Sequence, residues 1–278
     1  MKIAVIGKSG QLASCLRSVA NSSLDLTFYG SDVIDVTNSG TYAPLCSADL
    51  IINCSAYTAV DRAETYPEQA FAVNRMGVIQ LVDFCETYQK KLIHFSTDFV
   101  FDGEGIAPYK EEDYTDPKSV YGASKLAGEE VILQSSLSAL VLRTSWLYSP
   151  YGTNFCKTML RLSSQQSEIS VVADQIGTPT SALDLARAVF EIIKKGLPQS
   201  AEVLHVSNLG QCSWADFAQE IFDQKSKDIR VNAISTEAFN APAKRPKYSV
   251  LSTEKLLFQY GIAMRPWKEA LSEVLSLI

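Results

Sequence analysis

Tyr121 and Lys125 are the residues of this sequence whose types and spacing point most directly to catalysis. They lie four residues apart in a segment predicted to be a helix that begins near Ser119, so their side chains share one face of that helix. A neighbouring ammonium stabilises a phenolate, and Lys125 is therefore predicted to lower the pKa of Tyr121 from its usual value near ~10. Such a pair is a tuned general acid. The alternative is a solvated Tyr–Lys pair on an ordinary helix surface.

The segment before this helix brings further polar groups towards the same place. Residues 92–95 are mostly apolar, as is typical of a buried parallel strand, and Ser96, Thr97 and Asp98 follow directly. Open α/β sheets bind their ligands at the carboxyl ends of their strands. The strand end and the helix start are therefore predicted to converge on one substrate.

A glycine-rich turn lies near the start of the chain. Residues 2–6 are predicted to form a strand, and Gly7 and Gly10 follow within GKSGQLA, a GxxGxxA pattern that leads into a helix. Glycine at these positions permits a tight turn and lets the backbone approach a pyrophosphate, which the amides at the helix N-terminus would hold. The two glycines could instead serve only the turn, but their place at the start of an alternating chain favours a dinucleotide.

The next two predicted strands, residues 25–29 and 50–53, end in segments that would contact such a cofactor. An acidic residue after the second strand usually binds a ribose 2′-hydroxyl, and a basic one a 2′-phosphate. Asp32 could serve the ribose or only a turn, so NADH and NADPH both remain open. Small residues from 54 to 56 permit a flat cofactor to lie against the backbone. Thr58 could hydrogen-bond it, or could cap the next helix.

Composition limits the function classes. The chain has 278 residues, of which 46% are hydrophobic, and a net charge of −6, which argues against a nucleic-acid surface. Its six cysteines form no CxxC pair, as expected of reduced thiols in the cytoplasm. No run of about 20 apolar residues could span a bilayer, and the apolar run at the N-terminus is too short for a signal peptide. A cytoplasmic protein with no membrane partner is expected.

Strands and helices alternate through most of the chain, which predicts an α/β fold. Further helices are predicted at residues 67–88, 181–195, 213–222 and 267–278, and further strands at 139–144 and 203–206. Asn74, inside the first of these helices, is expected to be a polar core residue. Trp146 follows a strand end and could form an apolar wall against a ring-shaped substrate, or could simply fill core. Beyond residue 197 the alternation loosens, which suggests a smaller second domain that closes over the strand ends.

Eight motifs together resemble the dTDP-4-dehydrorhamnose reductase family of extended short-chain dehydrogenase/reductases. The most specific combination is STDFVFDG at 96–103 with VYGASKLAGE at 120–129. The others, in chain order, are GxxGQL at 7–12, NxSAYTAVDxAE at 53–64, RTSWLY at 143–148, NFxxTML at 154–160, DQxGTPT at 174–180 and RPxxSxL at 245–251. The resemblance covers nearly the whole chain in the expected order.

The resemblance implies a Rossmann-type, doubly wound parallel sheet with a smaller, discontinuous α/β substrate domain. The dinucleotide-binding domain would span residues 1–148 with a return near 170–205, and the sugar-nucleotide domain would be mainly residues 149–278. The implied activity is NAD(P)H-dependent reduction of the 4-keto group of dTDP-4-dehydrorhamnose to dTDP-L-rhamnose, a step in the biosynthesis of cell-surface polysaccharide.

The matched motifs also imply a role for each site residue. Tyr121 would protonate the carbonyl oxygen, Lys125 would lower the pKa of Tyr121 and hold the nicotinamide ribose, and Thr97 would hydrogen-bond the same oxygen. The other implied substrate contacts are Asp98, Trp146, Asn154 and Arg245, the last near the diphosphate. The implied cofactor contacts are Gly7, Gly10, Gln11, Leu12, Asp35, Val36, Ser55, Ala56, Tyr57, Thr58, Phe95, Ser96, Tyr121 and Lys125.

Two departures from the family pattern bear on metal binding. Members that bind Mg²⁺ between subunits carry glutamates at the places held here by Cys15 and Leu183. A thiol and an isobutyl group cannot replace hard oxygen ligands. No magnesium is therefore expected, and the protein is expected to be a monomer or a metal-independent homodimer.

Three other functions compete with this one. A reductase of another nucleotide-linked 4-keto sugar would use the same catalytic residues. A non-catalytic regulatory subunit of the same fold is disfavoured because Thr97, Tyr121 and Lys125 are all intact. An epimerase or dehydratase is disfavoured because dehydratases place acid/base carboxylates beside the threonine, where only Asp98 stands.

Overall fold

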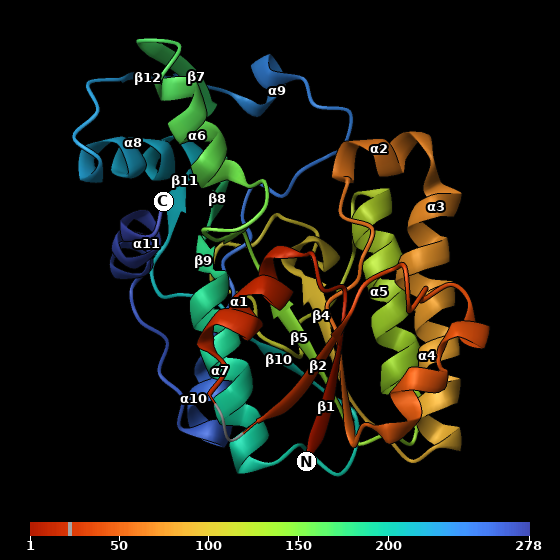
Figure 1. Cartoon of the computed structure of the whole chain (residues 1–278). Helices are drawn as coiled ribbons and strands as arrows, with labels where there is room; N and C mark the ends of the chain where they lie inside the picture. Colours follow the sequence, from red (N-terminus) through yellow and green to blue (C-terminus); the bar gives the residue numbers. More distant parts are fainter. Residues whose placement is uncertain (22–23) are drawn as a thin grey trace.

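The computed structural model, which describes residues 1–21 and 24–278, is built around a six-stranded parallel sheet (Figure 1). Its strands are β1 (Lys2–Ile6), β2 (Asp25–Tyr29), β3 (Leu50–Asn53), β4 (Lys91–Thr97), β5 (Ala139–Thr144) and β10 (Glu202–His205). Their order across the sheet is β10-β5-β4-β3-β1-β2. The chain therefore changes direction between β1 and β3, and the carboxyl ends of these two strands form the switch point at which open α/β sheets bind ligands.

Helices cover both faces of the sheet, which is the arrangement of a doubly wound fold (Figure 1). They are α1 (Gln11–Val19), α2 (Val60–Thr65), α3 (Pro67–Phe71), α4 (Gly77–Thr87), α5 (Val120–Leu133) and α7 (Ala182–Lys195), with the short turns η1 (Ser39–Thr41), η2 (Ala43–Ser47) and η4 (Asp98–Val100). On one face α1 packs against α7, and on the other α4 packs against α5. The predicted fold class is confirmed.

A second group of elements lies beside the carboxyl ends of the sheet (Figure 1). It contains α6 (Phe155–Ser163), β7 (Glu168–Val172), α8 (Trp214–Gln224), β12 (Arg230–Ile234), α9 (Thr236–Phe239) and α11 (Trp267–Ser276), with the short strands β6 (Leu147–Tyr148), β8 (Ile176–Gly177), β9 (Thr180–Ser181) and β11 (Cys212–Ser213). Strands β7 and β12 pair in parallel, and α6 packs against α8. Between these elements the chain returns to the large sheet through α7 and β10, and α10 (Glu254–Tyr260) packs on β10.

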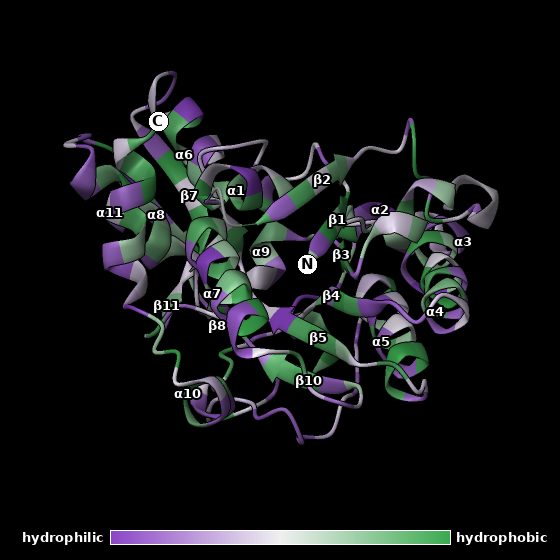
Figure 2. Ribbon diagram, turned by 60° about the horizontal axis from the view of Figure 1, so that its bottom comes forward, coloured by the Kyte–Doolittle hydropathy of each residue, from purple (hydrophilic) through white to green (hydrophobic). Residues whose placement is uncertain are grey.

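The core lies on both faces of the large sheet because successive side chains of a strand point to opposite faces. In β1, Ile3 and Val5 join the apolar cluster of α1 and α7, whereas Ala4 and Ile6 join the cluster of α4. In Figure 2 much of the central sheet is green, while α7, α8 and α11 change between green and purple along their length. Burial of one apolar face of each helix holds these layers together.

Two predicted helix starts are confirmed by their caps. Ser119 accepts a hydrogen bond from the backbone of Gly122 at 3.1 Å, and Ser213 forms a capping box with Asp216. Each cap satisfies a backbone amide that the helix itself leaves without a partner, which is typically worth about 1 kcal/mol. Helices α5 and α8 therefore begin where the sequence predicts.

The helix predicted at residues 67–88 is present, but a π-helical turn, η3 (Ala72–Met76), separates α3 from α4. Asn74 in this turn is buried, as predicted. Its side chain accepts a hydrogen bond from the backbone nitrogen of Tyr57 at 2.9 Å, and donates to the Tyr57 carbonyl at 3.0 Å and to Ser124 Oγ at 2.9 Å. The turn thus holds the loop after β3 against α5.

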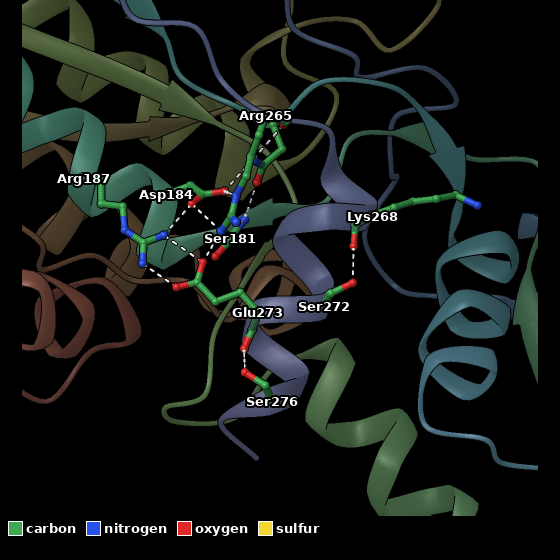
Figure 3. Close-up of polar contacts among 9 residues, drawn as sticks. Ser181, Asp184, Arg187, Arg265, Lys268, Ser272, Glu273 and Ser276 are labelled. Carbon is green, nitrogen blue, oxygen red and sulfur yellow. Dashed lines mark hydrogen bonds and ion pairs between the residues drawn. The ribbon is translucent and has the colours of Figure 1, made fainter.

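An ion-pair network fastens α11 to α7 (Figure 3). Arg265, just before α11, donates two hydrogen bonds of 2.8 Å to Asp184 in the first turn of α7. Arg187 bridges Asp184 and Glu273 through contacts of 2.9 Å to each carboxylate, and Arg265 also pairs with Glu273. These four charges join the C-terminal helix to a helix that packs on the large sheet.

Candidate active site

The glycine-rich turn joins β1 to α1 beside the loop that follows β3. Gly7 has a φ of +92°, and a Cβ there would lie 3.0 Å from the carbonyl carbon of Cys54 and from the nitrogen of Ser55. Glycine alone accepts both this conformation and this approach. Gly10 caps α1 without a side-chain hydrogen bond, so the first amides of the helix face outward for an anion.

A cavity of about 310 Å³ lies at this turn, at the switch point between β1 and β3. Six of the predicted cofactor residues line it, namely Gly7, Gly10, Asp35, Val36, Ser55 and Ala56. Cys54, the first of the small residues predicted to lie against a flat cofactor, also lines it, and so do Ser9 and Ser31, which were not predicted. The turn, the uncapped helix start and the cavity fit a dinucleotide.

The other predicted cofactor residues do not line this cavity. Tyr57 is held through its backbone by Asn74, and the Phe95 carbonyl accepts a hydrogen bond from Lys125. Asp32, considered for the ribose, pairs at 3.3 Å with Lys8 at the surface. The remaining residues of this set are Gln11, Leu12, Thr58, Ser96, Tyr121 and Lys125.

Gln11 and Asn154, predicted to contact the cofactor and the substrate respectively, hydrogen-bond each other. Asn154 Nδ2 donates to Gln11 Oε1 at 2.8 Å, and Ser149 Oγ donates to the same oxygen at 3.0 Å. Asn154 Oδ1 also caps α6 by accepting a hydrogen bond from the backbone of Lys157. Both side chains therefore connect α1 to the start of α6.

The predicted acid and its partners converge where β4 ends. Gly122 permits this approach, because a Cβ there would lie 2.2 Å from the carbonyl oxygen of Phe99. The start of α5 consequently rests on η4, which brings Tyr121 close to Thr97 and Asp98. The rings of Phe99 and Tyr121 meet edge to face, with centroids 5.6 Å apart. The strand end and the helix start thus come together as the sequence predicts.

The pKa of Tyr121 does not fall, contrary to the prediction. Burial raises the pKa of Tyr121 to about 12, a hydrogen bond from Thr97 opposes that rise, and the charge of Asp98 adds to it. The predicted effect of Lys125 is missing because its Nζ faces β4, where it donates to the Phe95 carbonyl at 2.6 Å.

Lys125 itself is almost fully buried, with 2% of its surface exposed. Burial lowers the pKa of Lys125 to about 8, although the charge of Glu129 raises it. Glu129 cannot come closer to the lysine, because its carboxylate forms an ion pair of 2.6 Å with Arg143.

Asp98 is a third buried titratable group of this site. Burial raises the pKa of Asp98 to about 6, against hydrogen bonds from Ser249 and Thr97 that lower it. The Thr97 hydroxyl lies 3.0 Å from the Asp98 carboxylate. Above this pH the ionised side chain can accept a hydrogen bond from a sugar hydroxyl.

A second cavity, of about 460 Å³, adjoins this strand end through Phe99. Trp146 lines it and stacks on Trp214, with centroids 3.6 Å apart and ring planes 7° from parallel. Glycine at position 177 leaves room for the Trp146 indole, because a Cβ at this position would lie 2.4 Å from Cε2 of that ring. Phe155 and Phe239 complete the apolar wall. Flat aromatic surfaces of this kind suit a sugar ring and a nucleobase.

Arg245 supplies the positive charge of this second cavity. Its guanidinium donates to the Asp61 carboxylate at 2.8 Å, and the backbone nitrogen of Ala243 donates to the other oxygen of that carboxylate at 3.3 Å. Asp61 belongs to α2, so this ion pair joins the segment that follows α9 to a helix beside the large sheet. Arg245 therefore lies where it could meet a diphosphate, but it already has an anionic partner.

Sequence reasoning missed several residues of the site. Asp61 lies within the NxSAYTAVDxAE motif, but its arginine partner is 184 residues away, so the motif was the available signal. Trp214 and Phe239 do not directly follow a strand that the sequence predicted, so nothing local marked them. His94, buried within β4 beside Lys125, looked like part of an apolar strand.

The positions that would carry magnesium ligands are apolar here. Cys15 and Leu183 are both buried, and burial raises the pKa of the Cys15 thiol to about 12. Within residues 1–21 and 24–278, no group of three or more His, Cys, Asp or Glu side chains could hold a metal ion. The expected independence from magnesium stays a prediction.

Comparison with known proteins gives a consistent result. A family model described as RmlD substrate binding domain matches residues 1–278. A dTDP-4-dehydrorhamnose reductase of Sinorhizobium fredii is 42% identical over 97% of this chain and 95% of its own. A Streptomyces antibioticus protein named probable dTDP-4,6-dihydroxy-2-methyloxan-3-one 4-ketoreductase is 37% identical over 98% of this chain and 94% of its own.

Solved structures agree with the sequence comparison. The crystal structure of dTDP-4-dehydrorhamnose reductase from Bacillus anthracis, in complex with NADP, is 37% identical and superposes with a TM-score of 0.95. The match covers 100% of each chain.

Among residues 1–21 and 24–278, none of the helices has the length and hydropathy that a membrane-spanning segment needs.

Proposed function

Because the chain belongs to the RmlD substrate-binding family, we propose that it reduces the 4-keto group of dTDP-4-dehydrorhamnose to give dTDP-L-rhamnose, with NADPH or NADH as reductant. The observation that carries the proposal is the convergence of Thr97, Asp98 and Tyr121 where β4 ends, beside an aromatic cavity that contains an arginine. A relative that is 42% identical over nearly the whole chain bears the name of this activity.

In the proposed reaction, Tyr121 donates its hydroxyl proton to the carbonyl oxygen of the substrate, and Thr97 hydrogen-bonds the same oxygen. The nicotinamide supplies the hydride when the cofactor is bound. Lys125 in its ammonium form would stabilise the phenolate left on Tyr121 and hold the nicotinamide ribose. Asp98 would accept a hydrogen bond from a hydroxyl of the sugar.

The two cavities give each ligand a place. The dinucleotide would lie across the glycine turn and the loops after β2 and β3, with its pyrophosphate on the amides of α1. The nucleotide sugar would fill the second cavity, with Trp146 against the hexose and Arg245 at the diphosphate. Asn154, at the start of α6, would contact the nucleotide sugar.

This division of ligands corresponds to the proposed domains. Residues 1–148, with a return near 170–205, would form the dinucleotide-binding domain, and residues 149–278 mainly the sugar-nucleotide domain. The pairing of β10 with β5 and the separate pairing of β7 with β12 support this discontinuous arrangement. We further propose a cytoplasmic monomer or metal-independent homodimer.

A reductase of another dTDP-linked keto sugar is the second candidate. The match to the Streptomyces antibioticus protein favours it, because that protein is named for a different dTDP-linked ketone. The aromatic wall of the second cavity would serve either sugar, so the fold does not separate the two.

The test is NADPH or NADH oxidation at 340 nm with dTDP-4-dehydrorhamnose, made in place by the upstream dehydratase and epimerase. Turnover with dTDP-L-rhamnose as product is the expected result, and the two reductants compared at equal concentration give the cofactor preference. Folded protein that binds NADPH but turns over only other dTDP-linked keto sugars would favour the second candidate. No turnover with any of them would favour a regulatory subunit.

A further inference from the structure

A chain of hydrogen bonds runs behind Lys125 from the loop after β3. It passes from Ser55 to Asn53, from Asn53 to His94 on β4, and from His94 to Lys125. The side chains of Asn53, His94 and Lys125 are 3%, 1% and 2% exposed, so water does not compete for these contacts. None of these contacts is needed for the proton transfer proposed above, which leaves the role of His94 open.

The direction of each hydrogen bond follows from the chemistry of its groups. The backbone nitrogen of Ser55 can only donate, and it donates to Asn53 Oδ1 at 3.1 Å. The amide of Asn53 is therefore oriented with its Nδ2, which also can only donate, 3.1 Å from His94 Nδ1. Nδ1 must accept this hydrogen bond and cannot carry a proton. A neutral imidazole then has its proton on Nε2.

His94 Nε2 lies 3.2 Å from Lys125 Nζ, so its N–H points at the lysine nitrogen. An ammonium has three N–H donors and no lone pair, whereas a neutral amine has one lone pair. An uncharged Lys125 can accept from Nε2 while it donates to the Phe95 carbonyl at 2.6 Å. A charged Lys125 would set two donors against each other.

We propose that His94 is a positioning residue that disfavours the charged form of Lys125 by directing its Nε2–H at the lysine nitrogen. This inference deepens the proposed reductase function, in which the ammonium form of Lys125 assists Tyr121. The burial that lowers the pKa of Lys125 to about 8 acts in the same direction. Burial and the charge of Lys125 also hold the pKa of His94 well below its usual value, which opposes an imidazolium.

The other charged groups near the lysine do not replace this effect. Glu129, one turn further along α5, favours the charged lysine, but Arg143 on β5 holds its carboxylate. Other groups that contact α5 from packed elements include Asp98 of η4, Glu64 of α2, which accepts from the Val120 backbone, and the neutral amide of Asn74 in η3. His94 is therefore the group in direct contact that sets the hydrogen-bond role of Nζ.

Two substitutions should change which atom donates in the hydrogen bond between His94 and Lys125, with little change in side-chain volume. Asn53→Asp places an acceptor opposite Nδ1, so the imidazole proton moves to Nδ1 and Nε2 offers a lone pair to Lys125. His94→Gln removes the forced donor without adding a charge, because its amide oxygen can face the lysine. Both should raise the pH at which Lys125 loses its proton.

The direct measurement is an NMR titration of protein labelled at lysine Cε, with the Lys125 resonance identified by its loss in Lys125→Met. The wild-type resonance should titrate near pH 8, and both variants should titrate at least one pH unit higher. The alkaline limb of the kcat/KM profile should move by the same amount. Exposed Asp228→Asn is the control and should leave the titration unchanged.

Three results would overturn the proposal. Wild-type Lys125 could titrate above about pH 10, like a solvated lysine. Both variants could keep the wild-type midpoint. A shift in Asn53→Asp without one in His94→Gln would assign the effect to the added charge alone. The titration needs no substrate, so it stands even if the reductase assay fails, and a wild-type midpoint above about pH 10 would overturn the proposal even if neither variant folds.

Discussion

Tyr121 can act as an acid only if the bound complex stabilises its phenolate, because burial in the free protein raises its pKa to about 12. The groups that can do so are close at hand. Thr97 lowers the pKa of the phenol, and Lys125 lies one helical turn away with a pKa of about 8. A turn of the Lys125 ammonium from the Phe95 carbonyl towards the phenol would add the missing positive charge.

Tyr121→Phe should therefore lower turnover by about two to four decades, because it removes the proton that the carbonyl oxygen receives. NADPH binding, measured by fluorescence titration, should change little. Tyr114→Phe, on a ring that is 86% exposed, is the matched control and should keep wild-type turnover. Undiminished turnover in Tyr121→Phe would remove this residue from the mechanism.

Asp98 is expected to decrease stability at neutral pH. Its pKa rises from 3.8 to about 6 on folding, so the folded state favours the protonated form, and stability falls as pH rises through that window. A shift of about two units corresponds to roughly 3 kcal/mol. Asp98→Asn should consequently raise Tm by several degrees at pH 8 and hardly at all at pH 4, as measured by calorimetry.

Asp228→Asn, at an exposed position, should show no such pH-dependent gain. An equal gain at pH 4 and pH 8 would mean that packing, and not charge, limits stability at Asp98. Asp98→Asn should also lose turnover if the Asp98 carboxylate binds the sugar. Function would then be obtained at this residue at the expense of stability.

At the scale of the elements, the site depends on how closely α5 approaches η4. Gly122→Ala would set a methyl group 2.2 Å from the Phe99 carbonyl oxygen, so the helix must move away from Thr97. We expect a loss of about 1–3 kcal/mol in the free energy of unfolding, together with a fall in turnover. Chemical denaturation and steady-state kinetics measure the two effects.

Glu130→Ala, at an exposed position of the same helix, is the control and should lower neither quantity by much. If Gly122→Ala kept full stability and turnover, the contact between α5 and η4 would not position the acid.

Elements were largely predictable because their signals are local. Apolar runs marked the strands, and Ser119 and Ser213 marked helix starts through bonds to residues three positions away. The π turn was not predictable, because Asn74 is held there by Tyr57 from another segment. The orientation of the Lys125 side chain depends on a contact between α5 and His94 of β4. The spacing of four residues between Tyr121 and Lys125 carries no information about that contact.

At the scale of the whole molecule, Asp61 and Arg245 are 184 residues apart in the sequence and join the two parts of the chain. Arg245→Gln should raise KM for the nucleotide sugar at least tenfold, because a diphosphate loses its guanidinium partner, while the Kd of NADPH stays the same. Exposed Lys247→Gln is the control. An unchanged KM would mean that Arg245 serves only the ion pair with Asp61.

The network of Figure 3 should make the attachment of α11 dependent on pH. Arg187 and then Arg265 lower the pKa of Glu273 to about 2, against an opposing effect of burial, so the stabilisation is complete above about pH 4.5 and is lost as pH falls towards 2. Solvent screens these partly exposed charges, and we expect about 1 kcal/mol. Glu273→Gln should therefore lower Tm by roughly 2–4 °C at pH 7 and by less at pH 3.5. Glu269→Gln, exposed on the same helix, is the control and should leave Tm unchanged at both pH values. A Tm difference between Glu273→Gln and the wild type that is constant with pH would show that Glu273 contributes packing instead of charge.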